Sequence, residues 1–225
     1  MNEGRPSYGL VVGDGMVVSN GLASTSLHKG TLEISGGVVS NHAGLVSVGI
    51  GKAKGVVRQT GGTFIGTTLG RATTIGSFGG EGEWTMDGGT ASVPGNLFIG
   101  GCEISDWNKT TSEPMYNVTS GSYGRLSITN GTFSVRWHAY VGKNGTGLVE
   151  VGTGGVFNVV GNIYVRSGGT LKFVFGPEGT GRIHSNASLQ VDENAKLVLD
   201  VSAYGTKPGR HKLIRAESSL GQFSP

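Results

Sequence analysis

The sequence has little cysteine, proline or charge. A single cysteine, Cys102, excludes an internal disulfide framework. Only 6 prolines occur, and without a three-residue period they exclude a collagen-like chain. The 18 basic and 15 acidic residues are scattered rather than gathered into basic runs, so nucleic acid is not an expected partner.

Long apolar runs are also missing. No stretch reaches the roughly 18 uncharged apolar residues of a membrane helix, so we expect no direct membrane insertion by this segment. The first residues lack the basic start and apolar core of a signal peptide. If the protein is exported, the signal segment is expected to have been removed, and the chain is interpreted as a fragment of a longer one.

Glycine is abundant instead, at 43 of 225 residues, and it punctuates a recurring pattern. A glycine followed by a two-residue alternation begins at 30, 55, 82, 124, 147 and 169, as in "GTLEISGG", "GEWTMDGG" and "GRLSITNG". The spacings are 25, 27, 42, 23 and 22 residues. Residues 101–123 are interpreted as an inserted loop that lengthens the third interval.

Each unit holds three short alternating segments that predict β-strands. Side chains alternate faces along a strand, so the apolar positions form inward columns from unit to unit. The first column is Leu32, Val57, Trp84, Leu126, Val149 and Leu171; the second is Val39, Phe64, Ala91, Phe133 and Phe157; the third is Val48, Ile75, Ile99, Val141 and Val165.

The corners are too short for an antiparallel partner within a unit, so each strand should pair with its counterpart one unit on. The sequence therefore predicts an all-β fold, a right-handed parallel β-helix with three strands per coil and about seven coils, as one domain over residues 1–225. Regular short strands with turn signals also fit an antiparallel sandwich or barrel.

The same alignment predicts opposite charges side by side on the outer face of the first sheet. It places Glu33 beside Arg58, Glu83 beside Arg125, and Glu150 beside Lys172. Such exposed pairs are expected to hold register more than to add stability.

The phrases "GTLEISGGVVS", "LFIGG", "YVGKNGTGLVEVGTGGVFNV" and "KLVLDVSAYGTKPGRHKLIRAESSLGQFS" carry a family resemblance. They resemble the β-helix repeats of autotransporter passengers and related bacterial surface proteins. The resemblance covers nearly the whole chain, and it implies an extended secreted or surface-exposed stalk of a kind that rarely carries catalytic motifs.

Catalytic and metal-binding patterns are not found. The aspartates fall at unrelated coil positions with no paired motif, and the histidines lack metal-ligand spacing. No catalytic residue, metal or cofactor is predicted, and an enzyme is not the favoured interpretation.

The candidate contact surface is the outward column of the third strand, which runs Ser47, Thr74, Phe98, Tyr140 and Tyr164. The inserted loop leaves the coil just after Phe98 and is expected to bring Trp107, Tyr116 and Tyr123 to that side. We predict that Phe98, Trp107, Tyr140 and Tyr164 contact a glycan or another surface protein. In the alternative, the loop only seals this apolar stripe.

These features predict a non-catalytic structural or adhesive module of an extracellular or cell-surface bacterial protein. Two alternatives stay open: a carbohydrate-binding or polysaccharide-degrading β-helix, and a phage fibre segment.

Overall fold

The structure is a computed structural model that describes residues 8–14, 17–19, 22–24, 29–42, 44–69, 72–102, 121–205 and 210–224. All regular secondary structure in these ranges is β-strand. They contain no helix with the length and hydrophobicity needed to span a membrane.

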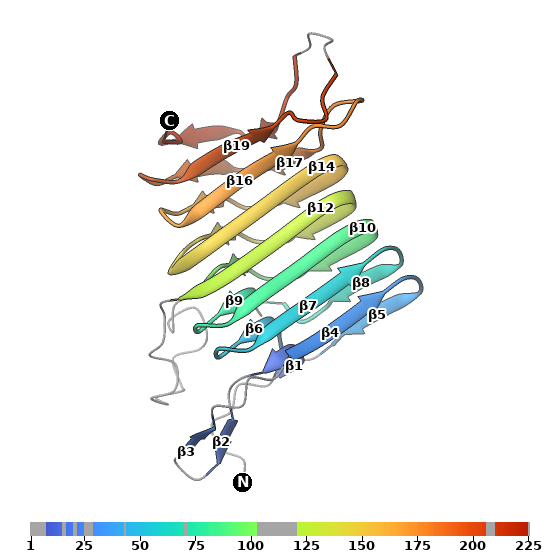
Figure 1. The fold of residues 1–225 in the computed structure, drawn as a ribbon, viewed down its shortest axis with the longest axis vertical. Helices are drawn as coiled ribbons and strands as arrows, with labels where there is room; N and C mark the ends of the chain where they lie inside the picture. Colours follow the sequence, from blue (N-terminus) through green and yellow to red (C-terminus); the bar gives the residue numbers. More distant parts are fainter. Residues whose placement is uncertain are drawn as a thin grey trace.

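The strands form two large sheets that run the length of the molecule (Figure 1). The short-strand sheet has eight strands: β1 (Tyr8–Asp14), β6 (Leu45–Ile50), β9 (Thr73–Ser77), β11 (Leu97–Ile99), β13 (Ala139–Val141), β15 (Ile163–Val165), β18 (Ser188–Val191) and β21 (Ser218–Leu220). The main path of the long-strand sheet is β4 (Lys29–Ile34), β7 (Lys54–Gln59), β10 (Glu81–Val93), β12 (Ser122–Val135), β14 (Gly145–Val159), β16 (Gly169–Val174) and β19 (Lys196–Asp200).

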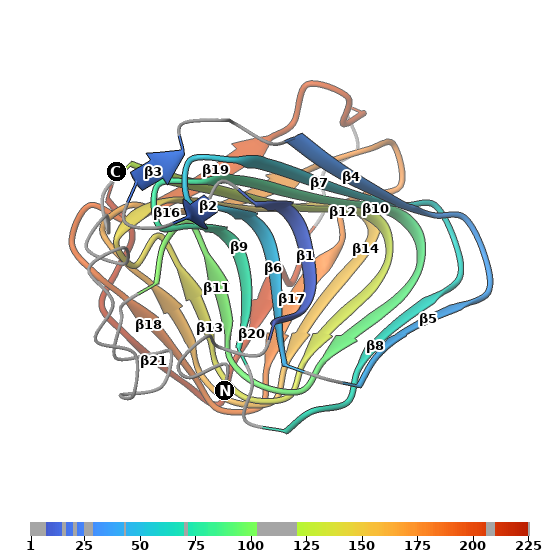
Figure 2. The same cartoon turned by 90° about the horizontal axis from the view of Figure 1, so that it is seen from below.

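Four further strands continue the long-strand sheet around a corner: β5 (Val38–Asn41), β8 (Thr63–Gly66), β17 (Arg182–Ser185) and β20 (Ile214–Arg215). Apart from the hairpin of β2 (Val17–Ser19) and β3 (Leu22–Ser24), every strand pairing is parallel. The chain is therefore a parallel β-solenoid, and its coils lie one above another when seen along the stack (Figure 2).

The solenoid has about six turns, against about seven expected from the sequence. At the C-terminal end β20 keeps only two residues, and the corner before it is longer than in the earlier coils. The first two predicted segments of a coil also fuse into single strands of 13, 14 and 15 residues in β10, β12 and β14. Register shifts near Asp87 and Asn130 let these long strands turn the corner without a break.

All three predicted inward columns are confirmed by the strand register. Leu126, for example, lies between Trp84 and Val149, and Ile99 lies between Ile75 and Val141. The column side chains form one continuous hydrophobic core. Because the column positions keep their register from coil to coil, their apolar side chains face the inside of the solenoid.

In the coil that contains Trp84, a large side chain in the first column compensates for a small one in the second. Ala91 lies between Phe64 and Phe133 in the second column, where a small residue leaves space. Trp84, in the same coil, packs edge-on against both rings, with ring centroids 5.0 Å from Phe64 and 5.2 Å from Phe133. Volume is therefore conserved within the coil rather than at each position.

Glycines close the corner between a short strand and the next long strand. Gly13, Gly49, Gly76, Gly100 and Gly142 all have φ between 69° and 76°. A Cβ on Gly49 would overlap the backbone at Glu81 and Gly82, and one on Gly82 would overlap the backbone of Gly76. Two glycine columns thus interlock along the stack, which explains why the sequence repeats "G-x-L-x-I" and "I-G" so persistently.

This corner generates a stability prediction. We expect Gly76→Ala to lower the free energy of unfolding by about 2–4 kcal/mol, because alanine at φ 70° is strained and its methyl group would overlap the Tyr123 carbonyl. The matched control is Gly36→Ala, where a Cβ meets nothing within 4 Å. Chemical denaturation of both variants measures the difference, and equal stabilities would contradict the interlocked corner.

Candidate functional site

The predicted aromatic column lies on the outer face of the short-strand sheet, in the expected register. Ser47 pairs with Thr74, Thr74 with Phe98, Phe98 with Tyr140, and Tyr140 with Tyr164. The Phe98 and Tyr140 ring centroids are 4.9 Å apart with 9° between the ring planes, and those of Tyr140 and Tyr164 are 4.7 Å apart with 7°. The three rings form a continuous stack that crosses three coils, called here the aromatic ladder.

Exposure differs sharply along the aromatic ladder. Phe98 has no exposed surface, because it packs into a second hydrophobic cluster on this face. Its neighbours in that cluster are Leu45, Ile50, Ala72, Phe78 and Cys102. Tyr140 and Tyr164 are half-buried. Of the predicted contact residues, Phe98 therefore presents no surface to a partner, while the two tyrosines do.

Of the predicted inserted loop, the structure describes residues 101, 102 and 121–123. Cys102 is buried beside Phe98. Trp107 and Tyr116 lie outside the described residues. Tyr123 pairs with Glu81 at the start of β12, so it belongs to the long-strand sheet rather than to the aromatic ladder.

The ring faces within the aromatic ladder are covered. Tyr140 is stacked between Phe98 and Tyr164, and the Lys143 ammonium lies 5.0 Å from the Tyr140 ring centre. Arg166 lies 4.9 Å from the Tyr164 ring centre and donates a hydrogen bond to Asp192 of the next coil. Sugars bind aromatic residues through exposed ring faces. What remains accessible here is mainly ring edges and hydroxyl groups.

Towards the N-terminus the same column becomes polar but stays buried. The Ser77 hydroxyl donates to Thr74, and the Thr74 hydroxyl donates to Ser47, each at 3.1 Å. The column thus changes from stacked rings to a buried hydroxyl chain without leaving its register.

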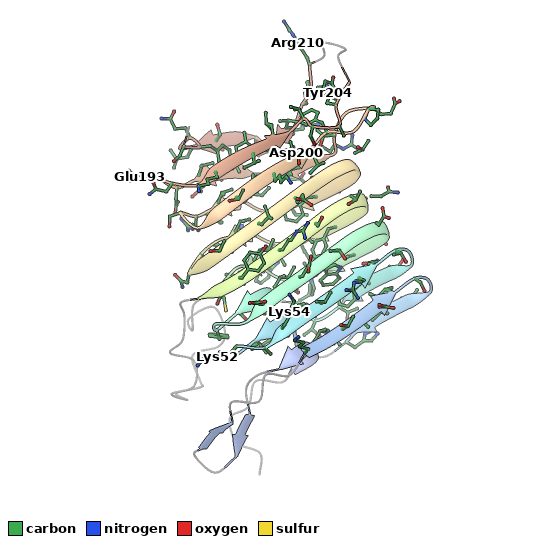
Figure 3. The ribbon with its side chains drawn as sticks, in the orientation of Figure 1. Lys52, Lys54, Glu193, Asp200, Tyr204 and Arg210 are labelled. Atoms are coloured by element: carbon green, nitrogen blue, oxygen red, sulfur yellow. The ribbon has the colours of Figure 1, made fainter. Side chains whose placement is uncertain are left out.

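The outer face of the long-strand sheet carries the three predicted charge pairs, and each is confirmed. The nitrogen–oxygen distances are 3.4 Å for Glu33–Arg58, 2.9 Å for Glu83–Arg125 and 3.2 Å for Glu150–Lys172. Arg125 also binds Glu150 at 2.9 Å, and Lys172 also binds Asp200 at 3.2 Å. Five alternating charges from Glu83 to Asp200 therefore form a charge ladder, which ends at Asp200 in the C-terminal coils (Figure 3).

The charge ladder sets the protonation of its carboxylates. Partial burial by itself would raise the pKa of Glu150, but hydrogen bonds from Arg125, Ser127 and Lys172 lower that pKa below its ordinary value. Hydrogen bonds from Ser202 and Lys172 lower the pKa of Asp200. A general acid of a glycoside hydrolase needs a raised pKa, so these carboxylates are poorly suited to that role.

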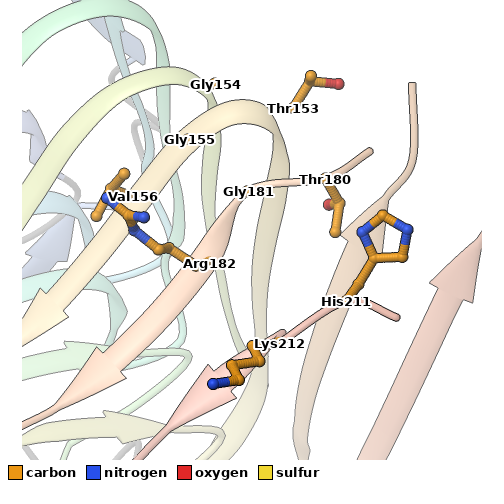
Figure 4. Close-up of a pocket in the computed structure, with 9 residues that line it drawn as sticks. All are labelled: Thr153, Gly154, Gly155, Val156, Thr180, Gly181, Arg182, His211 and Lys212. Carbon is orange, nitrogen blue, oxygen red and sulfur yellow. The ribbon is translucent and has the colours of Figure 1, made fainter. Parts of the chain in front are cut away.

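A hollow of about 330 Å³ opens at the corner of the C-terminal coils (Figure 4). It is lined by Thr153, Gly154, Gly155, Val156, Thr180, Gly181, Arg182, His211 and Lys212. The Tyr204 hydroxyl lies 2.8 Å from the His211 Nε2 atom, and both rings pack edge-on against Phe175. The hollow therefore lies beside a small aromatic cluster that fixes the loop around His211.

Sequence reasoning missed this hollow, although a signal was present. In the first four coils the second inward column follows the first-strand position by five residues, as from Ile128 to Phe133. Phe157 follows Val151 by six, Ile183 follows Phe173 by ten, and Ile214 follows Leu199 by fifteen. The length of this corner is therefore constant over the first four coils and then grows towards the C-terminus. In repeat proteins, insertions map to loops on one face, which is often the binding face.

No family model, no curated protein and no solved structure matches the chain. Within the part of the chain that the structure describes, no three histidine, cysteine, aspartate or glutamate side chains gather as a metal site.

The aromatic ladder yields the second prediction. Tyr140→Ala should lower the free energy of unfolding by about 2–4 kcal/mol, because it removes a ring stacked on both faces and leaves Phe98 uncovered on one side. Trp137→Ala is the control, since Trp137 is 44% exposed at a corner and should cost about 1 kcal/mol or less. Thermal or urea unfolding compares the two variants, and a larger loss for Trp137→Ala would contradict a stabilising ladder.

The charge ladder yields the third prediction, on Glu150→Gln at neutral pH. The Glu150 side chain is 15% exposed and contacts two cations, so we expect this variant to lose about 1–2 kcal/mol. The folded pKa of Glu150 lies below its ordinary value of 4.5, so its contribution is present above that pH and is lost as the pH falls through the folded pKa.

The stabilities of wild type and Glu150→Gln should therefore converge in acid. Glu33→Gln is the matched control, because its side chain is 72% exposed, and it should change stability little at any pH. Denaturation curves measured across the acid range test both statements. A gap between wild type and Glu150→Gln that persists in strong acid would show that the charge ladder is not its cause.

Proposed function

We propose that this chain is a structural and adhesive module of a secreted or cell-surface bacterial protein, and that it is not an enzyme. The observation that supports this proposal is that side chains on the outer faces of both sheets contact side chains of neighbouring coils. The aromatic ladder spans three coils and the charge ladder spans five strands, β10, β12, β14, β16 and β19. Such cross-coil contacts stiffen a rod, which is what a stalk that presents a binding surface needs.

The proposal includes the hand and cross-section of the coil. A parallel crossover is right-handed in nearly all proteins, which supports a right-handed coil here. The corner between β4 and β5, and between β7 and β8, supports three faces per coil even where neighbouring segments fuse.

The adhesive role would use a glycan or another surface protein as partner. The exposed edges of Tyr140 and Tyr164 are the accessible part of the predicted contact surface, and Trp107 would join them if the inserted loop lies alongside. The covered ring faces favour a protein partner, which can use ring edges and hydroxyl groups, over a sugar stacked on a ring at this place.

A carbohydrate-binding module is the second candidate function. The observation that favours it is the open hollow beside Arg182 and Lys212, where polar groups gather at a corner that is longer than its counterparts in the earlier coils. Binding there requires no catalytic carboxylates.

The fourth prediction tests surface location and absence of catalysis together. A protease added to intact cells that express the native gene should degrade the protein, because an exposed stalk is reachable from outside. Purified protein should release no reducing ends and no unsaturated products from neutral, uronic-acid-containing or sulfated polysaccharides. Protection of the protein in intact cells would overturn the location, and product release would overturn the non-catalytic role.

A further inference from the structure

The hollow at the C-terminal corner has the chemistry of an anion-binding site. Arg182 and Lys212 both line it and are exposed, and neither forms an ion pair with any described residue. His211 adds an imidazole held by Tyr204. None of the described residues that line the hollow is acidic, so its walls concentrate positive potential without internal compensation.

Two glycines in the lining of the hollow lie where neighbouring coils approach closely. A Cβ on Gly155 would overlap the Ile128 carbonyl, and one on Gly181 would overlap the carbonyls of Gly152 and Gly155. Neighbouring coils therefore pack directly against the backbone at these two positions, and only glycine fits there. The part of the wall that these glycines form is held by the packing of the coils.

The walls combine these cations with hydroxyl groups. The Thr153 hydroxyl donates to the Gly179 carbonyl, and the Thr180 hydroxyl donates to the Val151 carbonyl, so both are fixed in place. Each hydroxyl oxygen keeps a lone pair that can accept a hydrogen bond from a ligand. Figure 4 shows the Arg182 side chain beside Val156 and the His211 ring beside Thr180, so polar groups come from three separate segments.

Size argues for a molecule larger than a simple ion. At about 330 Å³ the hollow is at the lower end of the range of small-molecule pockets, which is about 300–1,000 Å³. A ligand that suits both the size and the walls carries an anionic group for Arg182 and Lys212 and hydroxyl groups for the threonines.

We propose that this hollow binds an acidic sugar unit, with its carboxylate or sulfate group held by Arg182 and Lys212. The inference deepens the adhesive part of the proposed function by naming a ligand class, and it is independent of the aromatic ladder. Ligand binding at this corner involves neither the hydrophobic core nor the strand register. Experiments can therefore contradict sugar binding without contradicting the structural role of the solenoid, and the reverse.

The test is a titration of the whole chain followed by backbone amide NMR. Glucuronate represents the carboxylated sugar, glucose 6-sulfate the sulfated one, glucose the neutral body, and inorganic sulfate the bare anion. We expect the amides of Gly154, Gly155 and Gly181 to shift with at least one acidic sugar, with glucose and sulfate each binding at least about tenfold more weakly. Added salt should weaken the binding.

Substitutions of the two cationic residues test whether acidic-sugar binding depends on their charge. Arg182→Gln with Lys212→Gln should weaken acidic-sugar binding about tenfold or more, and Lys212→Glu alone should do the same. Arg136→Gln with Lys196→Gln removes the same charge from two exposed positions outside the hollow and should leave binding unchanged. Unchanged melting temperatures verify that all variants are folded, as expected for exposed side chains.

Four outcomes would overturn the proposal. If glucose bound as tightly as the acidic sugars, the anionic group would not be required for binding. If inorganic sulfate bound as tightly as the acidic sugars, the hollow would be a site for simple anions and not for a sugar. An equal loss of affinity in the control variant would show that binding depends on the net charge of the protein and not on the two cations of the hollow. If the amides of the three glycines did not shift with any probe, the hollow would not be a binding site. Protease accessibility in intact cells and the absence of polysaccharide cleavage test the proposed function separately, so this result would not contradict it.

Discussion

The structure depends on one contact, the interlocking of glycine backbones at the corner between a short strand and the long strands that follow. Gly49, Gly76 and Gly100 each occupy a left-handed conformation and lie against the backbone of a glycine in a later coil. No residue with a Cβ fits either place without moving the chain. The corner therefore lets successive coils approach closely enough for the backbone hydrogen bonds that set the strand spacing in both sheets.

The side-chain ladders are consequences of that fixed approach. Parallel strands lie about 4.8 Å apart, close to the 4.9 and 4.7 Å separations of the stacked rings at Phe98, Tyr140 and Tyr164. The same spacing lets Arg125 contact Glu83 in the coil before it and Glu150 in the coil after it. Because the geometry repeats, a favourable pair in one coil can be extended by a suitable residue in the next.

The sequence predicted much of this arrangement because strand register in a solenoid is set by alternation and corner length. The inward columns, the charge pairs such as Glu33–Arg58 and the outward aromatic column all follow from aligning glycines. Burial of Phe98 did not follow, since it depends on Phe78 and Cys102 outside the strands. The fusion of segments in β12 was also hidden, because a bulge near Asn130 carries no distinct sequence signal.

The hollow was the harder feature to predict, and the reason is physical. Its walls come from β14, from β17 and from the segment around His211, at corners that have lost the repeat length. Alignment on a repeat discards such residues as irregular. Yet a corner excursion leaves the columns undisturbed, since the strands on either side keep their register. A lengthened corner can therefore carry chemistry that differs from coil to coil, while the ladders on the flat faces add contacts between coils.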